Sequence, residues 1–422
     1  MADHLPPRTV VIVDGYSNAA SLVTAFARRG LASAHVLSTP EPRPAMIPPR
    51  PEDYGEWLVC PDGTAVEQVV ARLRALDPVA VIAGQEPGVP LADTLSERLG
   101  LATNGTALSG ARRDKYEMIE TLRAAGIRCA DQFKTDDPDA AAAWAVRHGR
   151  TPVVIKPLSS ASSDHVFICR TAEEVAGAAR RVLAAHSMFA ERNTEVLVQE
   201  FLAGPEYAVD CVSADGSRYL AGVWESERRA IDGGRTIYDM CVLRDPDAAP
   251  VPSLDAYVQT VLDALGIQHG PSHAEVIVTP QGPTLVEIGA RLNGAMNADF
   301  YDAVFGTNVA ELVAHAYTEP GDFARRLGGR TYEPIRAAAV YEAPTALDGV
   351  VAAVDTSAVD QIVALPAVHS AAVRSGPGKR LRPTEDLLTS PLRVFLAGPD
   401  EASLRRDRAL VDDLKDEVYQ LL

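Results

Sequence analysis

Residues 272–291 read SHAEVIVTPQGPTLVEIGAR, and this stretch constrains the architecture more than any other. Polar and apolar residues alternate on both sides of the TPQGP turn, which predicts a β-hairpin. If the hairpin is symmetric about Gln281, Glu275 and Glu287 lie directly opposite each other, with Cβ atoms about 4.5–5.5 Å apart. Two carboxylates at that separation repel, and a divalent cation between them removes the conflict. The hairpin therefore predicts a magnesium site, with a solvated polar face as the alternative.

The alternation continues along both strands beyond the two glutamates. Their face is shared by His273, Gly289 and Arg291, whereas the core-facing positions are Val276, Val278, Val286 and Ile288. The glycine leaves space next to the metal, and the arginine brings a positive fork beside it. A slip of one residue in the register would reverse both faces.

The first hundred residues predict a small α/β domain. Apolar strands at 8–14, 32–38 and 78–86 alternate with helical patterns at 17–30 and 91–100, as in a parallel sheet. The turn after the first strand, DGYSNAAS, has one glycine where a dinucleotide-binding turn needs three, which argues against a nicotinamide cofactor.

The remaining chain predicts three further units. Helices and short strands alternate at first, strands dominate from residue 195, and a charged helix ends the chain at 400–422. We expect an N-terminal domain at 1–110, two lobes at 111–190 and 191–328, and a C-terminal region at 329–422.

Composition excludes some classes of function. The net charge of −17 argues against a nucleic-acid binder and against docking on an anionic membrane. Five scattered cysteines without a C-x-x-C pair indicate neither a thiolate zinc site nor a disulfide framework. We find no signal peptide and no apolar stretch near the ~20 residues of a membrane span, and therefore expect a cytoplasmic protein.

Lysine is scarce in this chain. Of the 40 basic residues, 35 are arginine and five are lysine, so each lysine points mildly to a place that needs a compact, flexible ammonium group. The alternative is that most of them are solvated; they are Lys115, Lys134, Lys156, Lys379 and Lys415.

These motifs, in this order, resemble the ATP-grasp superfamily over about residues 110–320. The resemblance rests on Lys115 in RRDKYEMIETLRAAGI, Lys156 in VVIKP, the segment QEFLAGPEY and the AEV…VEIGAR hairpin. Within the superfamily, the L-amino-acid ligases (dipeptide synthetases) are the most similar. The resemblance implies an α/β fold: an N-terminal Rossmann-like pre-ATP-grasp domain, a two-lobed α+β ATP-grasp module and a C-terminal β-rich α+β region.

The resemblance also implies roles for individual residues. Lys115 and Lys156 correspond to the lysines that contact the ATP phosphates, and Glu206 to the acid that holds the ribose. Glu275 and Glu287 correspond to the Mg²⁺ ligands. Arg291 corresponds to the arginine that steadies the transferring phosphoryl group. The adenine hinge corresponds to Glu200, Phe201 and Leu202.

Two departures from the family pattern stand out. The phosphate-covering loop is usually glycine-rich but reads SSASSDHV here, so Ser162 and Ser163 would contact phosphate instead, and His165 is a loop histidine or an extra contact. Many members carry Asn at the position of Gly289, which leaves Asn293 as a weak candidate for a third metal ligand or a substrate contact.

Candidates for the substrate end of the site come from position alone. His273 and Arg228, with its neighbour Arg229, could bind an oxyanion, or could be a structural histidine and a solvated strand end. Glu86, in AGQEP at a strand end where open α/β sheets bind ligands, could hold a substrate ammonium group or act as a turn acid.

The resemblance implies an ATP-dependent carboxylate–amine ligase. A carboxylate would form an acyl-phosphate with release of ADP, and an amine would then displace phosphate to give an amide. The implied cofactors are ATP and two Mg²⁺ ions, with Mn²⁺ as a substitute, and the implied partners are small carboxylates and amines, in a chain that could form a homodimer. The alternatives are an enzyme that activates bicarbonate and a non-catalytic nucleotide-binding protein.

Overall fold

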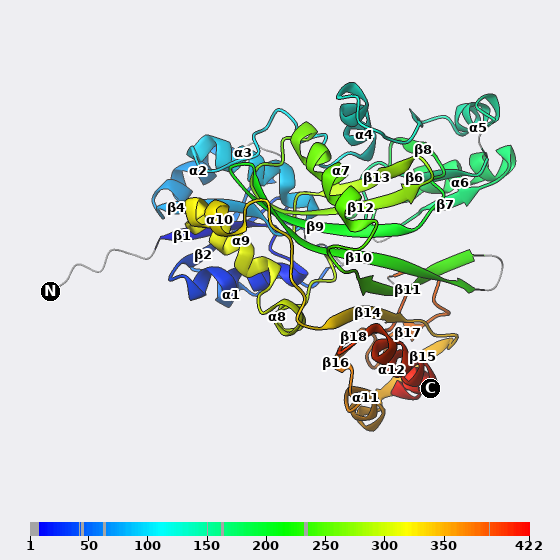
Figure 1. Ribbon diagram of the computed structural model, residues 1–422. Helices are drawn as coiled ribbons and strands as arrows, with labels where there is room; N and C mark the ends of the chain where they lie inside the picture. Colours follow the sequence, from blue (N-terminus) through cyan, green and yellow to red (C-terminus); the bar gives the residue numbers. More distant parts are fainter. Residues whose placement is uncertain are drawn as a thin grey trace.

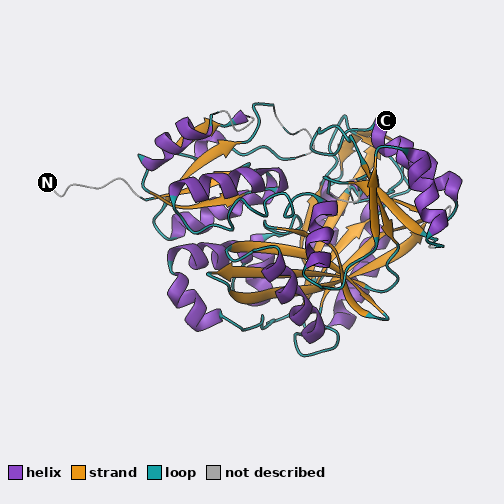
Figure 2. Cartoon of the chain, turned by 90° about the horizontal axis from the view of Figure 1, so that it is seen from above, coloured by secondary structure: helices purple, strands orange, loops and turns teal. Residues whose placement is uncertain are grey.

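The computed structural model describes residues 8–41, 43, 46–61, 65–149, 151–161, 164–231, 235–387 and 389–422. Within these residues the strands form four sheets, which Figure 1 shows in sequence colours. Helices lie outside the sheets, as the view from above in Figure 2 shows. No helix of the described residues has the length and apolar character needed to cross a bilayer.

The N-terminal unit is a parallel sheet of order β3-β2-β1-β4. Its apolar strands are buried on both faces, as is typical of parallel sheets. Alternate residues of β1 face α1 on one side and α2 with α3 on the other. The strands are β1 (Thr9–Val13), β2 (Ala32–Leu37), β3 (Glu56–Val59) and β4 (Pro78–Ala83), and the helices are α1 (Ala20–Arg28), α2 (Val66–Arg74) and α3 (Val89–Leu99).

The second unit is an antiparallel sheet of order β5-β8-β6-β7. Helices α5 and α6 cover one face, around Trp144, Val153 and Val198, while Lys156 and Leu197 lie on the opposite face of the strands. The strands are β5 (Gln132–Thr135), β6 (Val153–Pro157), β7 (Phe167–Cys169) and β8 (Val196–Glu200), and the helices are α4 (Lys115–Ala124), α5 (Pro138–Arg147) and α6 (Ala172–Ala184).

The centre of the molecule is an eight-stranded sheet of order β13-β12-β9-β10-β11-β14-β18-β16. Helix α7 (Val251–Ala264) packs on one face, and α8 (Ala298–Phe305), α9 (Val309–Thr318) and α10 (Pro320–Leu327) lie on the side of the N-terminal unit. Its first five strands are β9 (Glu206–Ala214), β10 (Ser217–Ile231), β11 (Arg235–Leu243), β12 (Gly270–Thr279) and β13 (Gly282–Gly289).

The C-terminal strands extend this same sheet. Met240 of β11 pairs with Tyr341 of β14, so the sheet crosses the boundary expected near residue 328. A smaller sheet of β17, β15 and β19 lies beside it. The elements are β14 (Ala337–Ala343), β15 (Gly349–Val354), α11 (Thr356–Val363), β16 (Val368–Val373), β17 (Arg380–Leu381), β18 (Leu392–Gly398), α12 (Glu401–Leu414) and β19 (Tyr419–Leu421).

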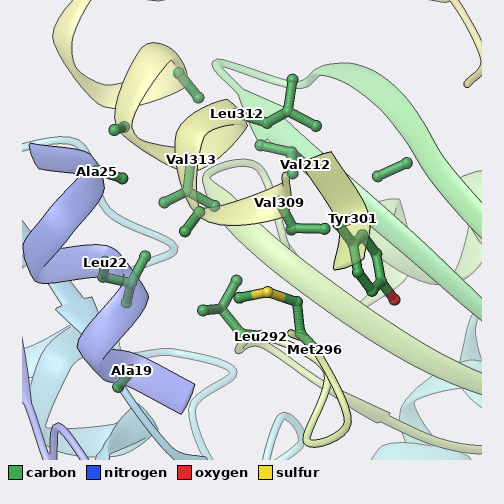
Figure 3. Packing of buried hydrophobic residues seen from close by; sticks show 14 of the residues in the cluster. Ala19, Leu22, Ala25, Val212, Leu292, Met296, Tyr301, Val309, Leu312 and Val313 are labelled. Atoms are coloured by element: carbon green, nitrogen blue, oxygen red, sulfur yellow. The ribbon is translucent and has the colours of Figure 1, made fainter. Parts of the chain in front are cut away.

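One apolar core joins the N-terminal unit to the central sheet. Leu22 and Ala25 of α1 face Val313 of α9, and Val212 of β9 lies on the far side of that helix (Figure 3). A buried ion pair reinforces the junction. The guanidinium of Arg112, which is fully buried, lies 3.0 Å from Asp93 of α3 and also donates to the Leu265 carbonyl at 2.8 Å.

We expect Asp93→Ala to lower the free energy of unfolding by about 3–5 kcal/mol, because it leaves the buried charge of Arg112 uncompensated. Urea denaturation measures this. The matched control is Glu67→Ala, which removes an exposed partner of Arg98 and should cost less than about 1 kcal/mol. If both variants lost the same free energy of unfolding, the Arg112–Asp93 pair would not stabilise the junction more than a surface ion pair does.

Candidate functional site

The hairpin β12–β13 places Glu275 directly opposite Glu287, as the sequence predicts. The reason differs from the predicted one. The turn pairs Thr279 with Gly282, so the hairpin is not centred on Gln281, and a bulge between Glu275 and Val276 restores the opposition of the glutamates. The bulged residue is Val286, and the predicted core position of that valine is wrong: Leu285 pairs with Val276 and is fully buried, whereas Val286 is only half-buried.

Two lysines from the second unit reach the paired glutamates. Lys115, the first residue of α4, lies 2.7 Å from Glu287 and donates to the Ser160 carbonyl at 2.6 Å. The Asp114 side chain caps the same helix and fixes where the helix begins, which sets the position of Lys115. Lys156 of β6 is 4% exposed, and burial together with the charge of Lys115 lowers its pKa to about 8.

The two carboxyl groups of the hairpin differ in how readily they ionise. Burial and the charges of Glu287 and Glu206 raise the pKa of Glu275 to about 7. Burial alone would also raise the pKa of Glu287, but Lys115 outweighs it and holds that pKa below its usual range. A carboxylate that is costly to ionise, beside one that stays ionised, is a donor set that a divalent cation stabilises.

His273 belongs to a buried polar group on the same face. It lies opposite Asp210 of β9, and its Nδ1 is 2.7 Å from the Asp210 carboxylate. Its Nε2 is 3.9 Å from Glu275. Burial alone would lower the pKa of His273, but Asp210 outweighs it and raises that pKa overall. Sequence reasoning missed Asp210, although it shares the alternation of Glu206 in EYAVDCVS and could have been found from it.

Asn293 is held by this group too. Its side-chain amide donates to Asp210 at 3.2 Å, and its Oδ1 accepts from the N–H of Ala295 at 2.8 Å. These bonds turn the side chain to Asp210 and occupy its oxygen.

Arg291 forms a buried ion pair with a distant residue. Its Nε donates to Glu86 at 2.8 Å, and Glu86 lies directly after β4 in the N-terminal unit, 205 residues earlier in the chain. A Cβ on Gly289 would lie 2.6 Å from the Glu86 carboxylate and 3.2 Å from Arg291 Nε. The missing side chain of Gly289 therefore makes room for the Glu86–Arg291 pair.

Glu206 is held by two partners from the ribbon β10–β11. Arg228 lies 2.5 Å from one of its carboxylate oxygens and Tyr238 donates to the other at 2.6 Å. Tyr238 was missed in the sequence, since one tyrosine in a strand carries no distinctive signal. Arg229 turns the other way, to Asp239 and Asp412, so the structure brings only the first of the two arginines to this group.

The segment Glu200–Leu202 crosses from one sheet to the other, because β8 ends at Glu200 and β9 begins at Glu206. The Glu200 carboxylate accepts the Asp131 N–H at 3.1 Å, while Phe201 is partly exposed. The predicted hinge therefore lies in the connection between the two sheets.

The serine-rich loop is organised by Asp164. Its carboxylate accepts from Ser160 at 2.7 Å and from the Met188 N–H at 2.9 Å, and it lies 2.6 Å from His165 Nδ1. His165 has φ of 52°, a conformation that glycine adopts more easily. The predicted phosphate contacts Ser162 and Ser163 lie outside the described residues.

A second group with metal-ligand chemistry, His315, Glu319 and Asp322, lies on α9 and α10. Its charges are already partnered: Asp322 pairs with Arg325 and Arg326, and Glu319 pairs with Arg29. At the hairpin, Lys115 partners Glu287, but no lysine or arginine of the described residues lies within 4.0 Å of Glu275, so the hairpin is the better candidate for a cation.

The chain is similar to known proteins in both sequence and fold. A sequence model of the ATP-grasp domain family matches residues 149–299. Dapdiamide A synthase of Enterobacter agglomerans is 31% identical over 415 residues, which cover 98% of this chain and 97% of that protein. Carnosine synthase 1 of Gallus gallus is 32% identical over 27% of this chain and 12% of its own length. The crystal structure of an L-amino acid ligase from Bacillus licheniformis has a TM-score of 0.73 at 18% identity, with 99% of both chains covered.

We expect Gly289→Ala to destabilise the protein by about 1–3 kcal/mol, because the added methyl group overlaps the Glu86 carboxylate and forces the ion pair apart. Urea denaturation tests this. Gly294→Ala is the matched control, since its Cβ would meet no atom within 4 Å. Equal stability of the two variants would show that the ion pair has room to move.

Proposed function

The chain belongs to the ATP-grasp family of ligases, and from this we propose that it joins a carboxylate to an amine through an acyl-phosphate, with release of ADP and phosphate. ATP-dependent formation of a C–N bond is the activity of its near relatives and of this enzyme. The observation that supports the proposed mechanism most is the half-buried Glu275–Glu287 pair with Lys115 on one of its carboxylates.

We assign the nucleotide to the space between the two sheets. The main chain at Glu200–Leu202 would meet adenine, and Glu206 would hold the ribose hydroxyls. Arg228 and Tyr238 both bond to Glu206, so we assign them the task of fixing its carboxylate. Lys115 and Lys156 would neutralise phosphate oxygens, and a nearby polyanion would favour the charged form of Lys156.

Glu275 and Glu287 would hold Mg²⁺, which supplies charge neutralisation at the phosphates when bound. We propose two ions, with Mn²⁺ as a substitute. The raised pKa of Glu275 supports this assignment, because a bound cation would favour its ionised form.

In the first step the substrate carboxylate attacks the γ-phosphorus, the bond to the bridging oxygen breaks and ADP leaves. Positioning and neutralisation of charge supply most of the catalysis of phosphoryl transfer. Arg291, held by Glu86, would steady the transferring group. Glu86 Oε1 has no hydrogen-bond partner among the described residues, so it is our candidate for a substrate ammonium group.

In the second step the amine attacks the acyl carbon, and phosphate leaves from the tetrahedral intermediate. The oxyanion needs a donor, and His273 Nε2 points to the metal end while Asp210 fixes Nδ1. Asn293 would help to position this group through Asp210.

We propose amino acids or amino-acid-like intermediates of natural-product biosynthesis as substrates. The full-length similarity to dapdiamide A synthase supports this class. We also propose a cytoplasmic location, which the five free cysteines support, and a homodimer, which light scattering would test.

The experiment that tests the function is a screen of amino-acid pairs with ATP and Mg²⁺, with phosphate release and product mass both recorded. The expected result is ADP formation that requires an amine and yields a product lighter than the two substrates by one water. ADP formation stimulated by bicarbonate and independent of the amine would overturn the proposal in favour of a carboxylating enzyme.

We expect Glu287→Gln to lower the rate of ADP formation about 100-fold or more while the fold survives, because a neutral amide cannot hold the cation. Coupled-enzyme detection of ADP and a thermal unfolding curve check both parts. Glu333→Gln, at an exposed position, is the control and should keep full activity. Wild-type rates in Glu287→Gln would sink the metal assignment.

For Lys156→Ala we expect the Kd of Mg·ADP to rise about tenfold or more, since a charged donor to phosphate is lost. Isothermal titration calorimetry measures this. Lys379→Ala, which removes an exposed lysine, should bind as the wild type does. Unchanged binding in Lys156→Ala would remove this lysine from the nucleotide site.

A further inference from the structure

Helix α12, near the end of the chain, carries a stripe of charged residues of both signs. Four residues at intervals of four, three and four lie on one side of the helix: Glu401, Arg405, Arg408 and Asp412. The adjoining side buries Leu404 and Val411 in the C-terminal core together with Met240 of β11. The charged stripe therefore faces the ribbon β10–β11, whose charged side chains it contacts.

Strand β10 presents a matching set of charges. Its sequence WESERRA places Glu225, Glu227 and Arg229 at every second position, so they share one face of the strand. We call the contacts between this face and α12, with Asp239 of β11 and Arg244, the ionic seam.

The first half of the ionic seam holds the middle of β10. Arg405 contacts Glu227 at 2.5 Å. Arg244 lies between Glu225 at 2.8 Å and Glu401 at 3.0 Å. Arg405 and Arg244 thus link the first turns of α12 to β10.

The second half of the ionic seam holds the part of the ribbon that carries Arg228 and Tyr238. Arg408 contacts Asp239 at 2.7 Å, and Arg229 contacts Asp239 at 3.1 Å and Asp412 at 3.2 Å. Tyr341 donates to Asp412 at 2.6 Å. Burial alone would raise the pKa of Asp412, but the hydrogen bonds from Tyr341, Lys415 and Arg229 outweigh it and lower that pKa. Asp412 therefore keeps its charge in the seam.

Each strand of the ribbon sends two adjacent residues to opposite sides. Arg228 and Tyr238 are register partners, and both bond to Glu206. Their immediate neighbours, Arg229 and Asp239, are the residues that the seam holds. One peptide bond on each strand therefore separates a residue of the seam from a residue that holds Glu206.

We propose that the ionic seam is a positioning device for the nucleotide site: α12 fixes Arg228 and Tyr238, and through them Glu206, from the back of the ribbon. The inference rests on the proposed function, because it assigns Glu206 to the nucleotide. It gives the C-terminal region a task in the reaction without contact to the substrate, and Asp412 is its central positioning residue.

A double-mutant cycle in the full chain tests this, with the Kd of Mg·ADP measured by calorimetry. We expect Asp412→Asn to raise the Kd about fivefold, within the usual range for coupled groups. In a background that carries both Arg228→Ala and Tyr238→Phe, the same change should have an effect of about twofold at most, because both paths to Glu206 are already cut. Asp239→Asn breaks the seam from the strand side and should give the same non-additive pattern. Asp413→Asn, the same change at the exposed next position of α12, should leave binding unchanged.

The outcomes separate the two proposals. Equal losses in both backgrounds would mean a general structural role for Asp412, which overturns the inference and leaves the proposed function intact. Wild-type binding by both Asp412→Asn and Asp239→Asn would also overturn the inference alone. Failure of the wild type to bind Mg·ADP would overturn the proposed function and the inference with it. Thermal unfolding curves of all variants establish that the compared proteins are folded.

Discussion

The repulsion between Glu275 and Glu287 is the constraint on which the site depends. Two half-buried carboxylates that face each other across a ladder are tolerated only where cations reach them. The hairpin cannot supply those cations, because its own arginine is engaged with Glu86. They come from the second unit, where the start of α4 delivers Lys115 and β6 delivers Lys156. Lys115 and Lys156 therefore bring positive charge from outside the hairpin to its two glutamates, and the proposed nucleotide and metal site is built on this arrangement.

Local periodicity explains what the sequence could predict. A turn signal between two alternating strands is enough to place Glu275 opposite Glu287, and the family resemblance over 110–320 follows from motifs that are local in the same sense. The bulge at Val286 could not be predicted, since nothing in TLVEI marks where an extra residue is inserted. The prediction of opposition survived because the bulge offsets an error of one residue in the assumed turn. The predicted core positions on β13 were consequently wrong at Val286 and correct at Ile288.

Contacts between distant segments account for most of what was missed. The sequence shows Glu86 at a strand end, but alternation gives no means of pairing it with a residue 205 positions later. Asp210 and Tyr238 matter because of the neighbours that the sheet order gives them, and the sheet order is set by tertiary packing. Tertiary packing also sets the place of β14. Its alanine-rich sequence has weak strand character, yet it extends the central sheet through its pairing with β11. The fold class was accessible from the sequence, whereas the partners of its charged residues were not.

Ion pairs link the three other units to the central sheet, in addition to the apolar core that joins the N-terminal unit and the strand pairing that joins the C-terminal one. Lys115 pairs with Glu287, Glu86 pairs with Arg291, and Asp412 pairs with Arg229, so each unit contributes one member of an ion pair whose other member is on or next to the hairpin or the ribbon. Such pairs add little net stability compared with apolar contacts, but loss of one partner is costly because it leaves a desolvated charge. They therefore act more on geometry than on stability. A net charge of −17 is compatible with a site for a polyanion on this basis, because the charged groups nearest the site, and not the surface average, set the field where the phosphates would lie.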